Sequence, residues 1–195
     1  MPRPPIKTRP ALTLLELLVV IAVLAVLAGL VLPRLTGVGD YAARQATKTT
    51  LNTVREGIIG ADHRPGYVQD METLPSTLAS LFLAPINANL YDPVTGHGWH
   101  GPYLQDAPGK YAINPSIGFT SEYGAANDPA PVDGWNHPII LQIPPDPTYA
   151  RLVSAGPDGI IQTPANISYP TTNPTNERGD DLVLFLTRPD LPPSP

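Results

Sequence analysis

An apolar segment close to the N-terminus constrains this chain more than any other feature. It covers residues 12–32 and contains a single charge, Glu16, after a short basic leader with Arg3, Lys7 and Arg9. About 20 apolar residues in helical conformation are enough to cross the hydrocarbon core of a bilayer. The segment therefore predicts a helix that spans a membrane or lies in an equally apolar protein environment.

Glu16 needs a special explanation, because a charged side chain at the centre of a membrane helix costs roughly 2.5–3.5 kcal/mol on insertion scales. In one interpretation the segment is a plain signal anchor, and Glu16 lies near the lipid headgroups without a role. In another it is a secretory signal peptide cut after Ala28, with small residues at the cleavage site. Pro33 ends the apolar run, but a helical pattern continues after it, which argues against a new N-terminus there.

A third interpretation comes from the residues at the start of the segment. The sequence from Ala11 to Glu16, Ala-Leu-Thr-Leu-Leu-Glu, resembles the cleavage and methylation motif of type IV pilins and type II secretion pseudopilins. In that family a prepilin peptidase cuts just before the apolar run and the new N-terminal residue is methylated. The resemblance implies cleavage between Ala11 and Leu12 and methylation of Leu12, although Gly and Phe are usual at these two positions.

The same resemblance assigns roles in assembly to two residues of the segment. Cleavage after Ala11 would make Glu16 the fifth mature residue, which is Glu in the family, and Pro33 the twenty-second, where a proline is common. A buried carboxylate needs a positive partner or several donors. In the family that partner is the N-terminal amine of a neighbouring subunit, so Glu16 would set the axial register of a helical filament.

Beyond the apolar segment, apolar residues recur at spacings of three and four as far as about Gly60, which predicts one long helix from Leu12 onwards. Pro33, with glycines near it, predicts a kink or a local interruption of this helix. Ser76 is expected to cap a short second helix at residues 76–83. Apolar runs predict three strands, and their short connections require antiparallel pairing. These strands cover residues 139–143, 151–154 and 182–186.

Together these elements predict an α+β protein in which a long N-terminal helix, half of it transmembrane, packs on a small antiparallel sheet; the resemblance makes this fold pilin-like. The 26 prolines and 16 glycines predict long loops, and no cysteine is available to tie them with disulfides. The expected organisation is a cleaved basic leader (1–11), a transmembrane and filament-core half-helix (12–35), a periplasmic globular domain (36–187) and a disordered Pro-rich tail (188–195).

Composition argues against several classes of function. A formal net charge of −5 without clustered Lys and Arg argues against nucleic-acid binding. The absence of Cys excludes thiol catalysis and Cys-based zinc sites, and neither a Gly-x-Ser-x-Gly turn nor a His-Glu-x-x-His motif is present. The chain is therefore not expected to be an enzyme. Its loop histidines are expected to be solvated rather than zinc ligands: His63, His97, His100 and His137.

A long polar loop near the C-terminus is the best candidate for a binding site. Asp158-Gly159 precedes residues 160–178, and Gly179-Asp180-Asp181 follows them. A loop of this length without secondary structure usually has a function or a staple, and calcium takes six to eight oxygens, supplied largely by carboxylates and backbone carbonyls. In the alternative interpretation Asp-Gly merely forms turns here. The available oxygen donors are Ser154, Asp158, Asp180 and Asp181.

Three stretches of the C-terminal half also resemble the major pseudopilin of type II secretion. Residues 152–159 with 179–182 resemble the family's C-terminal pattern, and residues 98–104 resemble its Gly-Trp-x-Gly-Pro-Tyr-Leu segment. Residues 133–138 resemble, with three departures, its Asp-Pro-Trp-Gly-Asn-Pro turn. In the family the C-terminal pattern closes a calcium site, so the resemblance implies a structural calcium ion here. The acidic loop is longer than usual, and residues 110–132 resemble an insertion.

The resemblance as a whole implies a structural subunit of the type II secretion pseudopilus, which polymerises through its N-terminal helix to drive protein export across the outer membrane. It implies a single-pass protein of the bacterial inner membrane with its C-terminal domain in the periplasm. The implied partners are further copies of this chain, other pseudopilins, prepilin peptidase, the inner-membrane assembly platform and membrane lipid. The alternatives are a type IV pilin or minor pilin, and a membrane-anchored enzyme or binding domain with an uncut N-terminus.

Overall fold

The fold is a computed structural model that describes residues 14–105, 109–167 and 178–187; within these, the side chains of residues 28–38 are not described. The predicted leader and the predicted tail at 188–195 lie outside the described residues. The chain divides into two compact units, residues 1–41 and residues 42–195.

Helix α1 (Leu14–Ile59) begins in the first unit and confirms the predicted long helix. Its backbone is helical without a break at Pro33, so the predicted interruption is absent. A proline removes one hydrogen-bond donor from a helix, and the turns before and after it keep the helical conformation here. Among the described residues, no helix is both long enough and apolar enough to cross a membrane.

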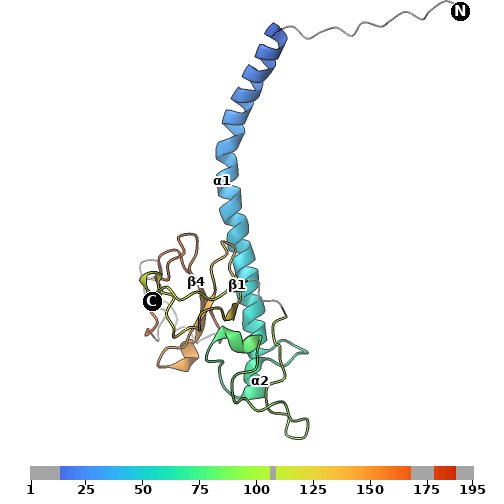
Figure 1. The fold of residues 1–195 in the computed structure, drawn as a ribbon, viewed down its shortest axis with the longest axis vertical. Coiled ribbons are helices and arrows are strands. Elements are labelled where there is room, and N and C mark those ends of the chain that lie inside the picture. The colour runs from blue at the N-terminus through green and yellow to red at the C-terminus, as the bar shows by residue number, and fades with distance from the viewer. Residues whose placement is uncertain (1–13, 106–108, 168–177, 188–195) are drawn as a thin grey trace, which may run out of the picture. The chain divides into compact units, whose positions relative to one another are not determined.

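The second unit contains a three-stranded antiparallel sheet of order β3-β4-β5, which confirms the predicted pairing. Its strands are β3 (Ile140–Gln142), β4 (Arg151–Ser154) and β5 (Leu182–Phe185). Each lies within the predicted residues, and β4 has the predicted bounds. Figure 1 shows β4 beside the lower part of α1.

Each face of this sheet is covered by its own hydrophobic cluster. The first cluster joins α1 residues at helical spacing, Leu51, Val54 and Ile58, to Leu141 and Leu152 of the sheet. The next residues along these strands point to the other face, because side chains alternate along a strand. They meet side chains of residues 110–132, so the stretch that resembles an insertion covers the second face. The second cluster consists of Tyr111, Phe119, Ala130, Ile140, Val153 and Ala155.

The remaining elements are short, and here the sequence-based predictions were less accurate. The predicted helix at 76–83 is a 3-10 helix, η1 (Leu78–Leu81), and its N-cap is Thr77 without a side-chain cap bond, not Ser76. Four residues without a cap are too few to sustain an α-helix by themselves. Helix α2 (Tyr67–Met71) was not predicted. The others are β1 (Gly109–Lys110), η2 (Pro115–Ile117), β2 (Pro129–Ala130) and η3 (Pro147–Tyr149).

Candidate functional site

Two parts of the chain are candidates for function, and the first is the start of α1. The processing residues Ala11 and Leu12 lie outside the described residues, whereas Glu16 lies in the first turn of the helix. Every residue from 14 to 27 is exposed, and its large apolar side chains range from 48% exposed at Val20 to 85% at Leu14. Exposed apolar area of this extent is unfavourable in water, so this half-helix needs lipid or other protein chains around it.

The second candidate is the acidic loop, where the structure brings three of the four predicted ligands together through Gln162. The Gln162 Nε2 donates to Asp158 Oδ2 at 2.8 Å, and its Oε1 accepts the backbone N–H of Asp180 at 3.0 Å. The backbone N–H of Gln162 donates to Asp181 Oδ2 at 2.9 Å. The backbone N–H of Asp158 also donates to Asp180 Oδ2 at 3.3 Å. One side chain thus connects the two ends of the loop.

Two carboxylate oxygens in this network lack partners. Asp180 Oδ1 and Asp181 Oδ1 are buried without a hydrogen-bond partner among the described atoms. An unsatisfied buried polar atom costs roughly 1–3 kcal/mol, and more if it is charged. Burial, helped by the charge of Asp180, raises the pKa of the Asp181 carboxyl, although backbone N–H groups of Gln162 and Thr163 oppose this shift. Partnerless buried oxygens of this kind fit a hard cation such as calcium.

The described residues do not form a complete metal centre from side chains alone. They contain no group of three or more His, Asp or Glu side chains arranged to hold an ion. Asp180 and Asp181 would therefore supply only part of a calcium shell of six to eight oxygens, and backbone carbonyls and water would supply the rest. Asp158 is exposed, and its Oδ2 already accepts the Gln162 amide.

Glycines at positive φ allow the ends of this loop to approach closely. Gly156 has a φ of 65°, and a Cβ built there would lie 2.6 Å from the carbonyl oxygen of Asp180. Gly179 has a φ of 54°, and a Cβ there would collide with the side chain of Gln162. Any other residue at these positions would be strained and would separate the two ends.

Ser154, the fourth predicted ligand, has a different partner. It is fully buried, and its hydroxyl donates to Asp133 Oδ2 at 2.7 Å. Asp133 is also buried, and its Oδ1 accepts the backbone N–H groups of Trp135 and His137, both at 2.9 Å. Ser154 therefore holds the turn at 133–137 in place. Asp133 was missed as a site residue, although the turn itself was identified by its resemblance.

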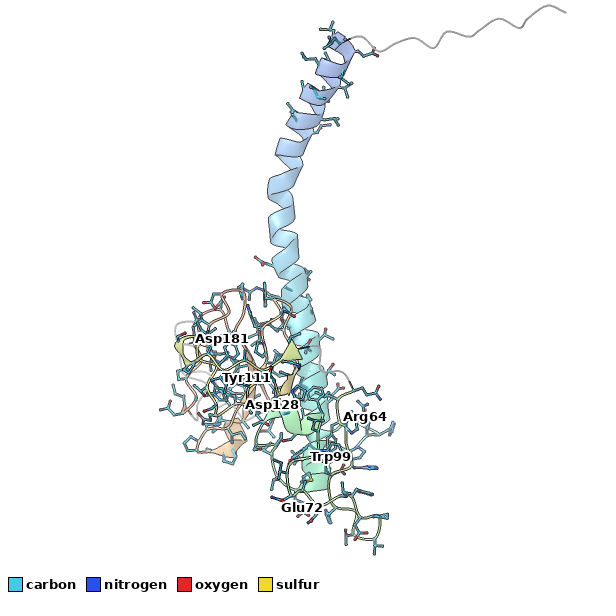
Figure 2. The ribbon with its side chains drawn as sticks, in the orientation of Figure 1. Arg64, Glu72, Trp99, Tyr111, Asp128 and Asp181 are labelled. Carbon is cyan, nitrogen blue, oxygen red and sulfur yellow. The ribbon has the colours of Figure 1, made fainter. Side chains whose placement is uncertain are left out.

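In the stretch at 98–104, Trp99 forms a packing anchor. The indole Nε1 of Trp99 donates to the carbonyl of Ser80 at 3.0 Å, and its ring meets Tyr103 edge to face. The hydroxyl of Tyr103 donates to Asp70 Oδ2 at 2.9 Å, and Asp70 is buried. Figure 2 places Trp99 well apart from Asp181, so this cluster and the acidic loop are separate parts of the unit.

Ionisation of the half-buried Tyr103 and the buried Tyr111 is expected to destabilise the fold in alkali. Burial raises the pKa of Tyr103 to about 12, with Asp70 contributing, and burial raises that of Tyr111 to about 12. Because both folded values exceed the ordinary value of 10.0, their stabilisation is complete below pH 10 and is lost as the pH rises to about 12. Spectrophotometric titration with thermal melts should show this loss. It should be smaller in Tyr103→Phe and unchanged in Tyr41→Phe, which alters an exposed ring.

Comparison with known proteins identifies the N-terminal segment. Residues 7–32 match the family model described as the prokaryotic N-terminal methylation motif. No curated protein and no solved structure matches the chain. The match covers the predicted cleavage site, Glu16 and the apolar run, and it supports processing by prepilin peptidase. The motif indicates a type IV pilin-like N-terminus, and an α+β fold that begins with a long helix agrees with that class.

Proposed function

We propose that this chain is a structural subunit of the type II secretion pseudopilus. The observation that carries the proposal is the methylation motif at residues 7–32, on a helix that exposes apolar side chains throughout residues 14–27. Such a half-helix is suited first to a bilayer and then to the core of a helical filament, because both cover it on all sides. The protein is then a substrate of prepilin peptidase and performs no catalysis itself.

Assembly would follow from the chemistry of the new N-terminus. Cleavage between Ala11 and Leu12 removes the basic leader and leaves an α-amine on Leu12, which is then methylated. In lipid Glu16 is costly, and it gains a cationic partner when the amine of a neighbouring subunit approaches. Pro33 lies where the half-helix of the filament core ends. Filament growth at the inner-membrane assembly platform, together with other pseudopilins, would push exported proteins across the outer membrane.

Calcium is proposed as the structural ion of the acidic loop. The buried partnerless oxygens of Asp180 and Asp181 support it, and Asp158 lies in the same hydrogen-bonded network. When bound, the ion supplies positive charge that neutralises these carboxylates and ties residues near 158 to residues near 180. The chain has no Cys, so such an ion would hold the two ends of the loop together, as a disulfide does in other proteins. Ser154 is left out of this proposed shell because it bonds to Asp133.

Two alternatives make different predictions. A type IV pilin or minor pilin would share the processing and the filament, but would serve adhesion or motility, and its genes would lie away from secretion genes. The acidic loop and the absence of Cys favour the pseudopilin. A membrane-anchored enzyme or binding domain would keep its leader and would function without Glu16.

The proposal is tested first by the intact mass and the N-terminal peptide of the chain purified from membranes. We expect a mature chain that starts at Leu12 and carries one added methyl group, because the motif places the cut there. Co-expression with an inactive prepilin peptidase serves as the control and should leave the leader in place. A chain that still starts at Met1, or one that starts at Gly29, would contradict the proposal.

A further inference from the structure

The sheet of the second unit buries a guanidinium group whose role is not explained by the functions above. Arg151 lies on the central strand β4 and is only 2% exposed, and Gln142, directly opposite on β3, is 1% exposed. The Nε of Arg151 donates to Oε1 of Gln142 at 2.9 Å. Buried arginines are usually paired with carboxylates, because an unpaired charge is costly to remove from water. In the described part of the chain, no carboxylate accepts a hydrogen bond from Arg151.

The partners of this pair are backbone carbonyl oxygens of one short segment. Arg151 donates to the carbonyls of Ile167 at 2.8 Å and Pro164 at 2.5 Å, and more weakly to that of Ala165 at 3.5 Å. The Nε2 of Gln142 donates to the carbonyl of Thr163 at 3.0 Å. Four carbonyls of residues 163–167 therefore accept hydrogen bonds from this pair, three from the charged guanidinium of Arg151 and one from the neutral amide of Gln142.

The segment held in this way also positions Asp181. While the carbonyl of Thr163 faces Gln142, its backbone N–H donates to Asp181 Oδ2 at 2.6 Å, next to the N–H of Gln162 at 2.9 Å. These two donors occupy Oδ2 and leave Oδ1 buried without a partner. The position of the partnerless oxygen thus depends on the segment that Arg151 and Gln142 hold.

We propose that Arg151 and Gln142 form an internal cationic staple that orders residues 163–167 without a metal ion and positions Asp181 for cation binding. Arginine suits this role because its planar group carries five donors and stays charged. The staple divides the long acidic loop into two parts. Residues 163–167 stay ordered by the protein alone, and only the ends near Asp158 and Asp180 depend on calcium. The ordering stands by itself, whereas the effect on cation binding rests on the proposed function.

Amide hydrogen exchange on the full-length chain in detergent, with a chelator present, tests the staple. In Arg151→Met we expect exchange in residues 163–167 to accelerate roughly tenfold or more, since several charge-assisted hydrogen bonds are lost. Arg151→Lys should give an intermediate increase, because an ammonium can donate to carbonyls but cannot span all of them. The matched control is Arg55→Met, whose guanidinium donates to the carbonyl of Leu186 outside the segment. It should leave residues 163–167 unchanged.

A second experiment measures the melting temperature as a function of calcium concentration. If Arg151 only stabilised the fold, its substitution would not change the calcium concentration that gives half of the stabilisation. Arg151→Lys should need several-fold more calcium for half of the stabilisation, whereas Arg55→Met should need the same amount as wild type. If Arg151→Met fails to fold, amide exchange at residues 163–167 in Arg151→Lys and Gln142→Leu tests the staple instead. Among the hydrogen bonds to this segment, Gln142→Leu removes only the one to the carbonyl of Thr163. Wild-type exchange at 163–167 in folded Arg151 variants would overturn the staple. Faster exchange there, with no calcium effect on any variant, would support the staple and contradict only the calcium proposal.

Discussion

Replacing Glu16 with valine is expected to abolish ordered filaments while the chain still enters the membrane and its second unit still folds. The substitution removes the only charge of the apolar segment, so insertion becomes more favourable, by at most roughly 2.5–3.5 kcal/mol, which is the cost of a charge at the helix centre on insertion scales. It also removes the carboxylate that we propose to pair with the N-terminal amine of the next subunit. Subunits without this pair have no preferred axial position, because apolar contacts alone are non-directional.

The measurement is electron microscopy of sheared filaments, together with the fraction of the chain found in membranes. Glu56→Gln is the matched control, since it removes an exposed carboxylate from the same helix, α1, but within the second unit. It should leave filaments intact. Normal filaments in Glu16→Val would contradict the proposed role of Glu16 and would favour an anchored domain with a different function.

The long helix and the sheet could be predicted because their signals are local. Leu51, Val54 and Ile58 lie at helical spacing and are buried together, and the strand predicted at residues 151–154 has the same bounds as β4. The short helices near residue 70 and residue 80 were harder. Their few residues carry little periodic signal, and their packing against the rest of the unit decides their form.

The polar contacts of the site could be predicted only in part, because they depend on strand pairing and loop closure. Asp158, Asp180 and Asp181 share a hydrogen-bonded network through Gln162, which was not predicted, and Ser154 bonds to Asp133, which lies on a turn far away in the sequence. The pair formed by Gln142 and Arg151 arises from the register of β3 against β4, which local sequence does not specify. The polar residues Gln142 in β3 and Arg151 in β4 were the available signal, and it was not used.

Calcium is expected to raise the melting temperature of the full-length chain at pH 7 by roughly 5–10 °C when free calcium is a hundredfold above its dissociation constant. The physical reason is that the ion binds the folded chain and supplies partners to the buried oxygens of Asp180 and Asp181. Asp181→Asn keeps the shape of the side chain and its acceptor but removes the charge, so this variant should show almost no calcium effect. The matched control is Asp128→Asn, which alters a half-buried carboxylate that accepts a backbone N–H outside the loop.

The pH dependence of the melting temperature separates this site from a set of turns. Burial raises the pKa of Asp181 in the folded chain above the ordinary value of 3.8. Without calcium, a carboxyl whose pKa is raised by folding stabilises the folded chain only while it is protonated. The contribution of Asp181 to the free energy of unfolding therefore declines as the pH rises from 3.8 through its pKa in the folded chain. Calcium needs the charged form, so its effect must be largest at neutral pH and must fall as the pH drops through that same value. In chelator at pH 7, Asp181→Asn should therefore melt no lower than wild type. Two results together would mean that these aspartates only shape turns. In chelator at pH 7 the Asp181→Asn variant would melt several degrees below wild type, and the melting temperature of wild type would not change with calcium at any pH.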